Sequence, residues 1–169
     1  PFGIPFLRIF AVFRQKSIDR VEIWAPEVFF FKGYWYCYFT AAEDLTESLA
    51  KDTSRRTYGM KSKTDDIFGE WEKAVKIDLP DDYRSIDATF FEYKDKQYIV
   101  YAGWPNAYNL DYRQHLYIQE LEKDNPLKVA STEGERHLIS EPTNIWEIDG
   151  GTGQNEAPAV AFAPDNTPI

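Results

Sequence analysis

Residues 24–40 read WAPEVFFFKGYWYCYFT. Aromatic and β-branched side chains fill two runs, Val28–Phe31 and Tyr34–Thr40, on either side of Lys32-Gly33. Such side chains pack well on a pleated surface, and a short break that contains glycine is typical of a β-hairpin. The stretch therefore predicts a hairpin of two strands, and the rest of the fold follows from where this hairpin recurs.

Similar runs occur twice more along the chain. They are Ala88–Tyr93 with Tyr98–Trp104, separated by Lys94–Gln97, and Ala157–Phe162, followed by a turn at residues 164–166. The three hairpins start near Trp24, Asp87 and Glu156, which lie 63 and 69 residues apart. This regular spacing predicts a repeated structural unit.

Shorter strand-like runs lie between the hairpins: Arg56–Lys61, Ala74–Ile77, Leu116–Glu120 and Arg136–Ile139. Helical periodicity is nearly absent, and we expect Glu43–Asp52 to be a loop. About four antiparallel strands in each repeat are typical of β-propeller blades, which stack because one sheet cannot bury both of its faces alone. We therefore expect an all-β partial propeller of about two and a third blades. Residues 16–80 would form one blade, 81–150 the next, and 151–169 the start of a further one.

Composition narrows the possible partners. The chain has 28 acidic and 19 basic residues, a net charge of -9, so nucleic acid and anionic membranes are poor partners. No apolar run is long enough to span a membrane. The single cysteine, Cys37, lies in an apolar run and is expected in the core. His115 and His137 fit no metal-ligand spacing and are expected at the surface or in loops, so no metal site is predicted.

The two ends of the sequence do not follow the repeat. The chain starts at Pro1, so no signal peptide is visible, and Pro1–Gln15 fits no blade strand. It finishes shortly after Ala157–Phe162, without the partner strand that this run predicts. We expect both ends to be cuts through a larger domain.

A carboxylate recurs at the start of each hairpin, as Glu27, Asp87 and Glu156. The first strand of a propeller blade lines the central channel, so acids at equivalent positions would converge there. Converging carboxylates repel one another, so at least one should have a raised pKa and serve as a general acid. Glycoside hydrolysis requires such an acid, together with a base that activates water. An acid at a strand start can equally cap a loop, and spacing alone leaves both interpretations open.

Four motifs, in order along the chain, resemble glycoside hydrolase family 43. They are WAPE at 24–27 with its aromatic hairpin, IDAT at 86–89 leading into QYIVYAGW at 97–104, LISEPTNIWE at 138–147, and NEAPAV at 155–160. The resemblance covers about residues 20–162, most of the chain. The Trp-Glu and Asn-Glu-Ala-Pro arrangement most resembles the exo-acting arabinofuranosidase branch.

The resemblance implies a five-bladed propeller that inverts the anomeric configuration with three acids. Glu156 matches the general acid, and Asp87 matches the acid that tunes its pKa and orients it. Trp24, Glu27 and Trp104 are implied candidates for binding the sugar. Glu27 has a second interpretation as a structural anchor of its loop, and Trp104 as a core residue. Tyr108 is a further candidate stacking platform.

The resemblance is incomplete in two places. The family's base lies in an Asp-Pro-like motif upstream, and Asp19, the only Asp before Trp24, does not resemble it. The base is therefore expected to be absent from this chain. The last blade and its cation-binding histidine are also missing, so we expect no cofactor here and a channel calcium only in the full domain.

These implications predict a glycosidase that acts on arabinose- or xylose-containing plant cell-wall oligo- or polysaccharides, most similar to α-L-arabinofuranosidases. The substrate class implies an extracellular protein. Without its base, the chain alone is expected to be inactive or nearly so. One alternative is a non-catalytic carbohydrate-binding propeller, in which the acids hydrogen-bond sugar hydroxyls. The other is an invertase-like fructosidase, whose Asn-Asp-Pro, Arg-Asp-Pro and Glu-Cys motifs do not occur here.

Overall fold

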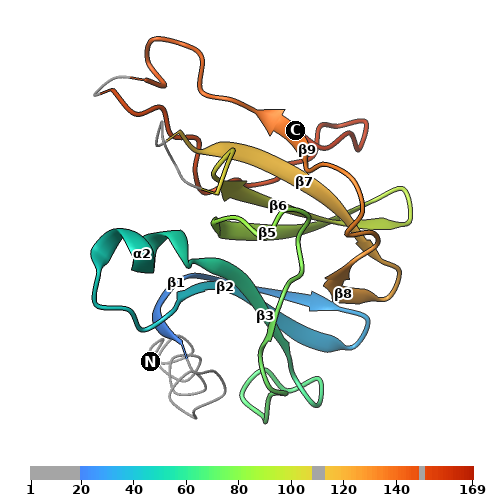
Figure 1. Ribbon diagram of the computed structural model, residues 1–169. Helices are drawn as coiled ribbons and strands as arrows, with labels where there is room; N and C mark the ends of the chain where they lie inside the picture. The colour runs from blue at the N-terminus through green and yellow to red at the C-terminus, as the bar shows by residue number, and fades with distance from the viewer. Residues whose placement is uncertain (1–19, 108–112, 149–150) are drawn as a thin grey trace, which may run out of the picture.

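The computed structural model describes residues 20–107, 113–148 and 151–169. They form two antiparallel sheets and a short helix, α2 (Ser48–Thr53), as Figure 1 shows. The first sheet contains, in order, β1 (Val21–Phe31), β2 (Tyr34–Ala42), β3 (Arg56–Lys61) and β4 (Val75–Lys76). The second contains β5 (Ser85–Tyr93), β6 (Lys96–Gly103), β7 (His115–Glu122), β8 (Asn125–Val129) and β9 (His137–Ser140).

The first two of the three predicted hairpins are present, with tight two-residue turns. Lys32 and Gly33 join β1 to β2 with φ values of 46° and 86°. Lys94 and Asp95 join β5 to β6 with φ values of 49° and 62°, so β6 begins at Lys96, earlier than predicted. Positive φ at both central residues matches the right-handed twist of the flanking strands, which is why such turns close hairpins.

The second sheet contains one strand more than the sequence predicted. Strand β8 was not predicted, and it pairs with the end of β7 through Leu121 and Val129. Strand β9 pairs with the start of β7 through Tyr117 and Leu138. Because β6 occupies the other edge of β7, β8 and β9 share one edge and the sheet is still four strand positions across.

Two local predictions were wrong. Glu43–Asp52 is not entirely a loop, because α2 begins at Ser48 after the Glu47 carboxylate accepts hydrogen bonds from the N–H groups of Leu49 and Ala50. Ala157–Phe162 does not form a strand, and only an isolated bridge joins Phe162 to Pro168. The reason lies in the prolines at 158, 164 and 168, which cannot donate to a ladder.

The main core lies between the two sheets. Phe29 of β1 stacks on Phe90 of β5 with ring centroids 4.2 Å apart, and Tyr38 contacts Phe29 edge-on. At Gly59 of β3 the sheets come so close that a Cβ atom would lie 2.5 Å from Leu127 Cδ2 of β8. A larger residue at this position would force the Leu127 side chain to shift, so glycine allows the closest approach of the two sheets. This packing fixes the inner strands β1 and β5 against each other.

The outer face of the first sheet carries a second core that contains Cys37, Phe39 and Met60. Cys37 is fully buried, and burial raises the pKa of its thiol to about 12, which confirms the prediction of a core residue. The prediction for His115 was wrong, because this residue is buried in β7 beside Tyr117. His137 is exposed, at the first position of β9.

Candidate active site

The inner strands β1 and β5 both contain a bulge at the position of the sequence motifs. Pairing shifts register between Trp24 and Glu27 in β1 and between Ile86 and Thr89 in β5. A register shift breaks the alternation of inward and outward side chains by which a strand is predicted from sequence. Both strands therefore start earlier than predicted. Bulges of this kind re-aim side chains next to active sites.

The backbone marks one equivalent position in each repeat. Ala25 and Asp87 have positive φ values of 43° and 53° inside their bulges, and Ala157 repeats this conformation with 46°. Alignment on these three residues makes Glu156 equivalent to Trp24, and Glu27 equivalent to Thr89. The expectation that the three acids occupy equivalent positions was therefore wrong.

The three segments nevertheless converge. Together they line a pocket of about 330 Å³ formed by Ala25, Pro26, Glu27, Asp87, Ala88, Ala157 and Pro158. The pocket lies where the starts of the first and second hairpins meet the segment that follows Glu156. Sequence repeats 63 and 69 residues apart thus contribute to one surface.

Asp87 is a half-buried carboxylate at the centre of this arrangement. Its Oδ2 accepts a hydrogen bond from the backbone N–H of Ala157 at 3.3 Å, and its own N–H donates to Thr40 Oγ1 at 3.4 Å. Burial raises the pKa of Asp87, and the charge of Glu156 acts in the same direction. The Ala157 N–H and Arg84 oppose this rise without cancelling it. Burial, more than the charge of the neighbouring acid, therefore raises the pKa of Asp87.

Glu156 has an exposed carboxylate that is held from behind by Gln114. Gln114 Nε2 donates to Glu156 Oε1, although the Gln114 residue is only 1% exposed. The backbone of Gln114 also holds the segment before Glu156, donating to Gly153 O and accepting from Asn155 N, each at 3.0 Å. Position and side chain of Glu156 therefore depend on the same glutamine.

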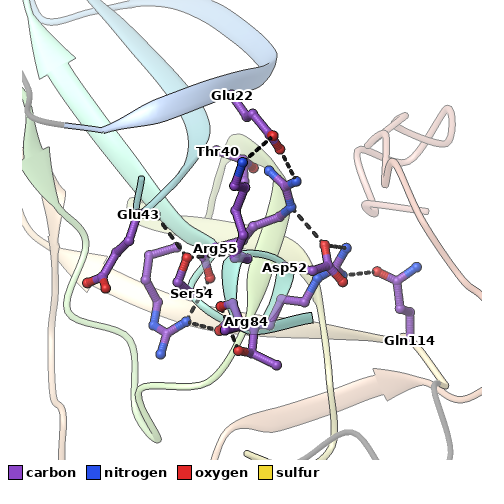
Figure 2. Close-up of polar contacts among 12 residues, drawn as sticks. Glu22, Thr40, Glu43, Asp52, Ser54, Arg55, Arg84 and Gln114 are labelled. Carbon is purple, nitrogen blue, oxygen red and sulfur yellow. Dashed lines mark hydrogen bonds and ion pairs between the residues drawn. The ribbon is translucent and has the colours of Figure 1, made fainter. Parts of the chain in front are cut away.

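Gln114 belongs to a partly buried polar network that reaches Glu22 in the first sheet. Arg84 Nη1 donates to Gln114 Oε1, and Arg84 Nη2 lies 3.4 Å from Asp52 Oδ1 of α2. Arg55 links Asp52 to Glu22, at 2.8 Å and 2.5 Å. Figure 2 shows Arg55 between Glu22 and Asp52, and Arg84 between Asp52 and Gln114.

Sequence reasoning missed this network. A signal was available at Arg84, which stands three residues before Asp87 in a run that otherwise leads into an apolar strand. A buried arginine is rare unless it is paired, so its place beside a candidate acid points to a structural or catalytic partner. Gln114 carried no such signal, because only the fold brings it to Glu156.

The three candidates for sugar binding have different surroundings in the structure. Glu27 Oε1 accepts hydrogen bonds from Thr89 Oγ1 at 2.5 Å and from Phe90 N at 3.3 Å, so it joins β1 to β5 as a structural anchor. Trp24 is 41% exposed, with the Arg55 guanidinium 3.2 Å from its ring centroid. Trp104 is 4% exposed beneath Arg84, so it packs as a core residue.

Three parts of the sequence discussed above lie outside the described residues: Asp19, Tyr108 and Pro1–Gln15. Within the described ranges, no three His, Cys, Asp or Glu side chains are grouped closely enough to hold a metal ion. In the same ranges, no helix has the length and apolar character that crossing a membrane requires.

Comparison with known proteins gives a match over most of the chain. The model of Glycosyl hydrolases family 43 matches residues 11–163. An extracellular exo-α-(1→5)-L-arabinofuranosidase of Streptomyces avermitilis is 33% identical over 146 residues, and one of Streptomyces chartreusis is 31% identical over 132 residues. These alignments cover 86% and 76% of this chain but 28% and 36% of the relatives, so the chain spans about a third of their length.

Solved structures support the fold. The α-L-arabinofuranosidase from Lactobacillus brevis superimposes with a TM-score of 0.69 at 28% identity, covering 83% of this chain and 42% of that one. The Penicillium chrysogenum α-L-arabinanase superimposes with a TM-score of 0.58 at 18% identity, over 89% and 38% of the two chains. With the two sheets described above, these matches confirm an all-β partial propeller. The division into blades at residues 80 and 150 stays a prediction.

Proposed function

Because this chain belongs to Glycosyl hydrolases family 43, we propose that its protein hydrolyses the glycosidic bonds of arabinose-containing saccharides. The names of the two Streptomyces relatives and of the Lactobacillus brevis structure support arabinofuranose as the sugar removed. Xylose-containing saccharides stay a second substrate class. The relatives are named extracellular, so secretion is part of the proposal.

One observation supports the location of the reaction in particular. The Asp87 carboxylate accepts a hydrogen bond from Ala157 N, the N–H group that directly follows Glu156 in the chain. An orienting acid and a general acid must lie side by side, and this bond joins the Asp87 side chain to the backbone next to Glu156, at the edge of the pocket. A carboxylate of β5 and one of the C-terminal segment, 69 residues apart in sequence, fit the requirement of glycoside hydrolysis.

The chemistry assigns one step to each group. Glu156 gives its proton to the glycosidic oxygen as the bond from that oxygen to the anomeric carbon breaks. A water molecule forms the new bond on the opposite face of the sugar and loses its proton to a base, which inverts the configuration. Asp87 orients Glu156 and the segment that carries it. The base matches no motif among these residues and is proposed to lie elsewhere in the protein, as is any channel calcium.

The test compares this chain with the complete product of its gene. Sequencing the gene upstream of the Pro1 codon shows what precedes this chain in that product. We expect the complete product to release arabinose from an α-1,5-linked arabino-oligosaccharide with inversion, followed by proton NMR of the anomeric signals. Glu156→Gln should lower kcat/KM by about 10²–10⁴-fold, the usual contribution of a general acid. The chain alone should be slower by a similar factor of about 10²–10⁴, because the base is proposed to lie elsewhere in the protein.

Different results separate the remaining possibilities. A robust rate from the pure chain would show that another carboxylate serves as base. A complete product that binds arabino- and xylo-oligosaccharides in calorimetry but hydrolyses neither would refute the enzyme and leave a carbohydrate-binding propeller. Hydrolysis of xylosides only would change the proposed substrate from arabinose- to xylose-containing saccharides. The proposed roles of Asp87 and Glu156 would stay the same.

A further inference from the structure

We infer that Gln114, locked by Arg84, is a positioning residue for Glu156 and selects the carboxyl oxygen that carries the proton for transfer. The inference rests on the proposed function, because it assigns Gln114 a task in the step that Glu156 performs. It concerns residues that no sequence motif marked.

The contact with Arg84 fixes the orientation of the Gln114 amide. Arginine only donates hydrogen bonds, so the group that faces Arg84 Nη1 must be the carbonyl oxygen of Gln114. The amide nitrogen then has to face Glu156 Oε1. An amide that is free to flip offers either an acceptor or a donor, whereas this one offers Glu156 a donor only.

The fixed Gln114 amide decides which oxygen of Glu156 carries the proton. A carboxylic acid has one oxygen that carries the proton and one that accepts. Because Gln114 Nε2 donates to Oε1, that oxygen must stay the acceptor in the protonated acid. The proton is therefore held on Oε2, and Oε2 is the atom from which it passes to the glycosidic oxygen.

Arg84 is itself held in place by neighbouring charged residues. Its guanidinium lies against Asp52 of α2, which Arg55 holds from the other side, so the first sheet braces the amide of the second. Gln114 and Arg84 are 1% and 7% exposed, and a buried pair of this kind has little freedom to rearrange. Figure 2 shows this part of the network from Asp52 through Arg84 to Gln114.

Gln97 provides an internal comparison. It is also a buried glutamine, 3% exposed, and its Nε2 donates to a carboxylate, Glu92 Oε1, at 3.2 Å. Its Oε1, however, has no hydrogen-bond partner. Gln97 therefore has the same burial and the same type of donor contact without an arginine that fixes the amide, and it lies away from the pocket.

The test compares two leaving groups in the complete gene product. A dinitrophenyl arabinofuranoside loses its leaving group without protonation, whereas arabinobiose needs the general acid. Gln114→Glu keeps the contact with Arg84 and removes the donor to Glu156. We expect it to lower kcat/KM on arabinobiose by about 10–100-fold and on the dinitrophenyl substrate by less than about threefold.

Matched variants separate positioning from folding. Gln97→Met should leave the ratio of the two substrates unchanged, and Gln114→Met should reproduce the effect of Gln114→Glu. Equal losses on both substrates for the Gln114 variants would mean that Gln114 only supports the structure, and the inference would be wrong.

A spectroscopic arm does not depend on turnover. With nitrogen-15 in the glutamine side chains, the Gln114 NH₂ signals should move on Glu156→Gln and on Arg84→Met, while the Gln97 signals stay in place. Unmoved Gln114 signals would overturn the inference. If the unmodified complete product hydrolyses neither substrate, the proposed function fails, and these signals alone decide whether the contact from Arg84 to Glu156 exists.

Discussion

Strand β1 of the first sheet and strand β5 of the second both interrupt their pairing with a bulge, and they use it differently. In β1 two residues have positive φ, Glu22 and Ala25, and the carboxylate Glu27 comes two residues after the second of them. In β5 the residue with positive φ is itself the carboxylate, Asp87. Glu27 bonds to Thr89 and Phe90 of the neighbouring strand, whereas Asp87 bonds to Ala157 at the pocket.

Glu27 and Asp87 thus stand at different positions relative to their bulges and have different partners. A carboxylate beyond the bulge is in the regular part of the strand, where it satisfies donors of the next sheet. Asp87, inside its bulge, faces Ala157 at the pocket, whereas Glu22, at the first register shift of β1, pairs with Arg55. Non-glycine residues with positive φ cost of order 1–3 kcal/mol and cluster at functional sites, and Asp tolerates this conformation better than Ala.

The largest expected difference between the two acids is in activity. In the complete gene product, Asp87→Asn should lower kcat/KM on an arabino-oligosaccharide by about 10²-fold, because the orienting charge beside Glu156 is lost. Glu27→Gln keeps an oxygen acceptor for Thr89 and should lower kcat/KM by less than about tenfold. Steady-state kinetics on both variants check this. Similar losses would mean that Glu27 also acts on the substrate.

The next difference is in stability. Glu27→Ala leaves the Thr89 hydroxyl and the Phe90 N–H without their acceptor, which should lower the free energy of unfolding by about 1–3 kcal/mol. Urea unfolding followed by tryptophan fluorescence measures this change. Adding Thr89→Val to Glu27→Ala should cost less than Thr89→Val alone, because the two groups share one interaction. Additive costs would contradict the anchor.

A smaller effect is expected from relieving the bulge itself. Ala25→Gly removes a Cβ atom from a residue with φ of 43°, and it should raise the free energy of unfolding by about 1 kcal/mol after the entropy cost of glycine. Ala41→Gly is the matched control, since Ala41 lies in β2 outside the positive-φ residues and its substitution should be destabilising. The same direction of change at both positions would refute strain at Ala25.

The smallest effect concerns pH. Burial and the charge of Glu156 raise the pKa of Asp87 in the folded chain, so ionisation of this carboxyl opposes folding. Its favourable contribution is complete below the unfolded pKa of about 3.9 and is lost as pH rises through the folded value. Asp87→Asn should therefore raise the unfolding midpoint near pH 7, and the gain should vanish near pH 3. A loss of stability at pH 7 would show that the charge of Asp87 supports the fold.

Local chemistry made much of the fold predictable. The aromatic runs around Lys32-Gly33 and Lys94-Asp95 specify hairpins, because strand-forming side chains and tight turns are local properties. Strand β8 was missed because Asn125–Val129 is short and contains Pro126, so it forms only by pairing with β7. The strand predicted over Ala157–Phe162 failed because Pro158 lies within the run and Pro164 and Pro168 follow it, and proline cannot donate to a ladder.

The sequence by itself determined the repeated hairpins, the family resemblance and the candidate pair Asp87 and Glu156. These follow from spacing and residue type along the chain. The tertiary structure alone decided that Glu27 anchors β5, that Trp104 is buried, and that Gln114 lies between Arg84 and Glu156. The physical reason is that a hydrogen bond depends on distance in space, and Gln114 and Glu156 lie 42 residues apart in sequence until the fold brings them together.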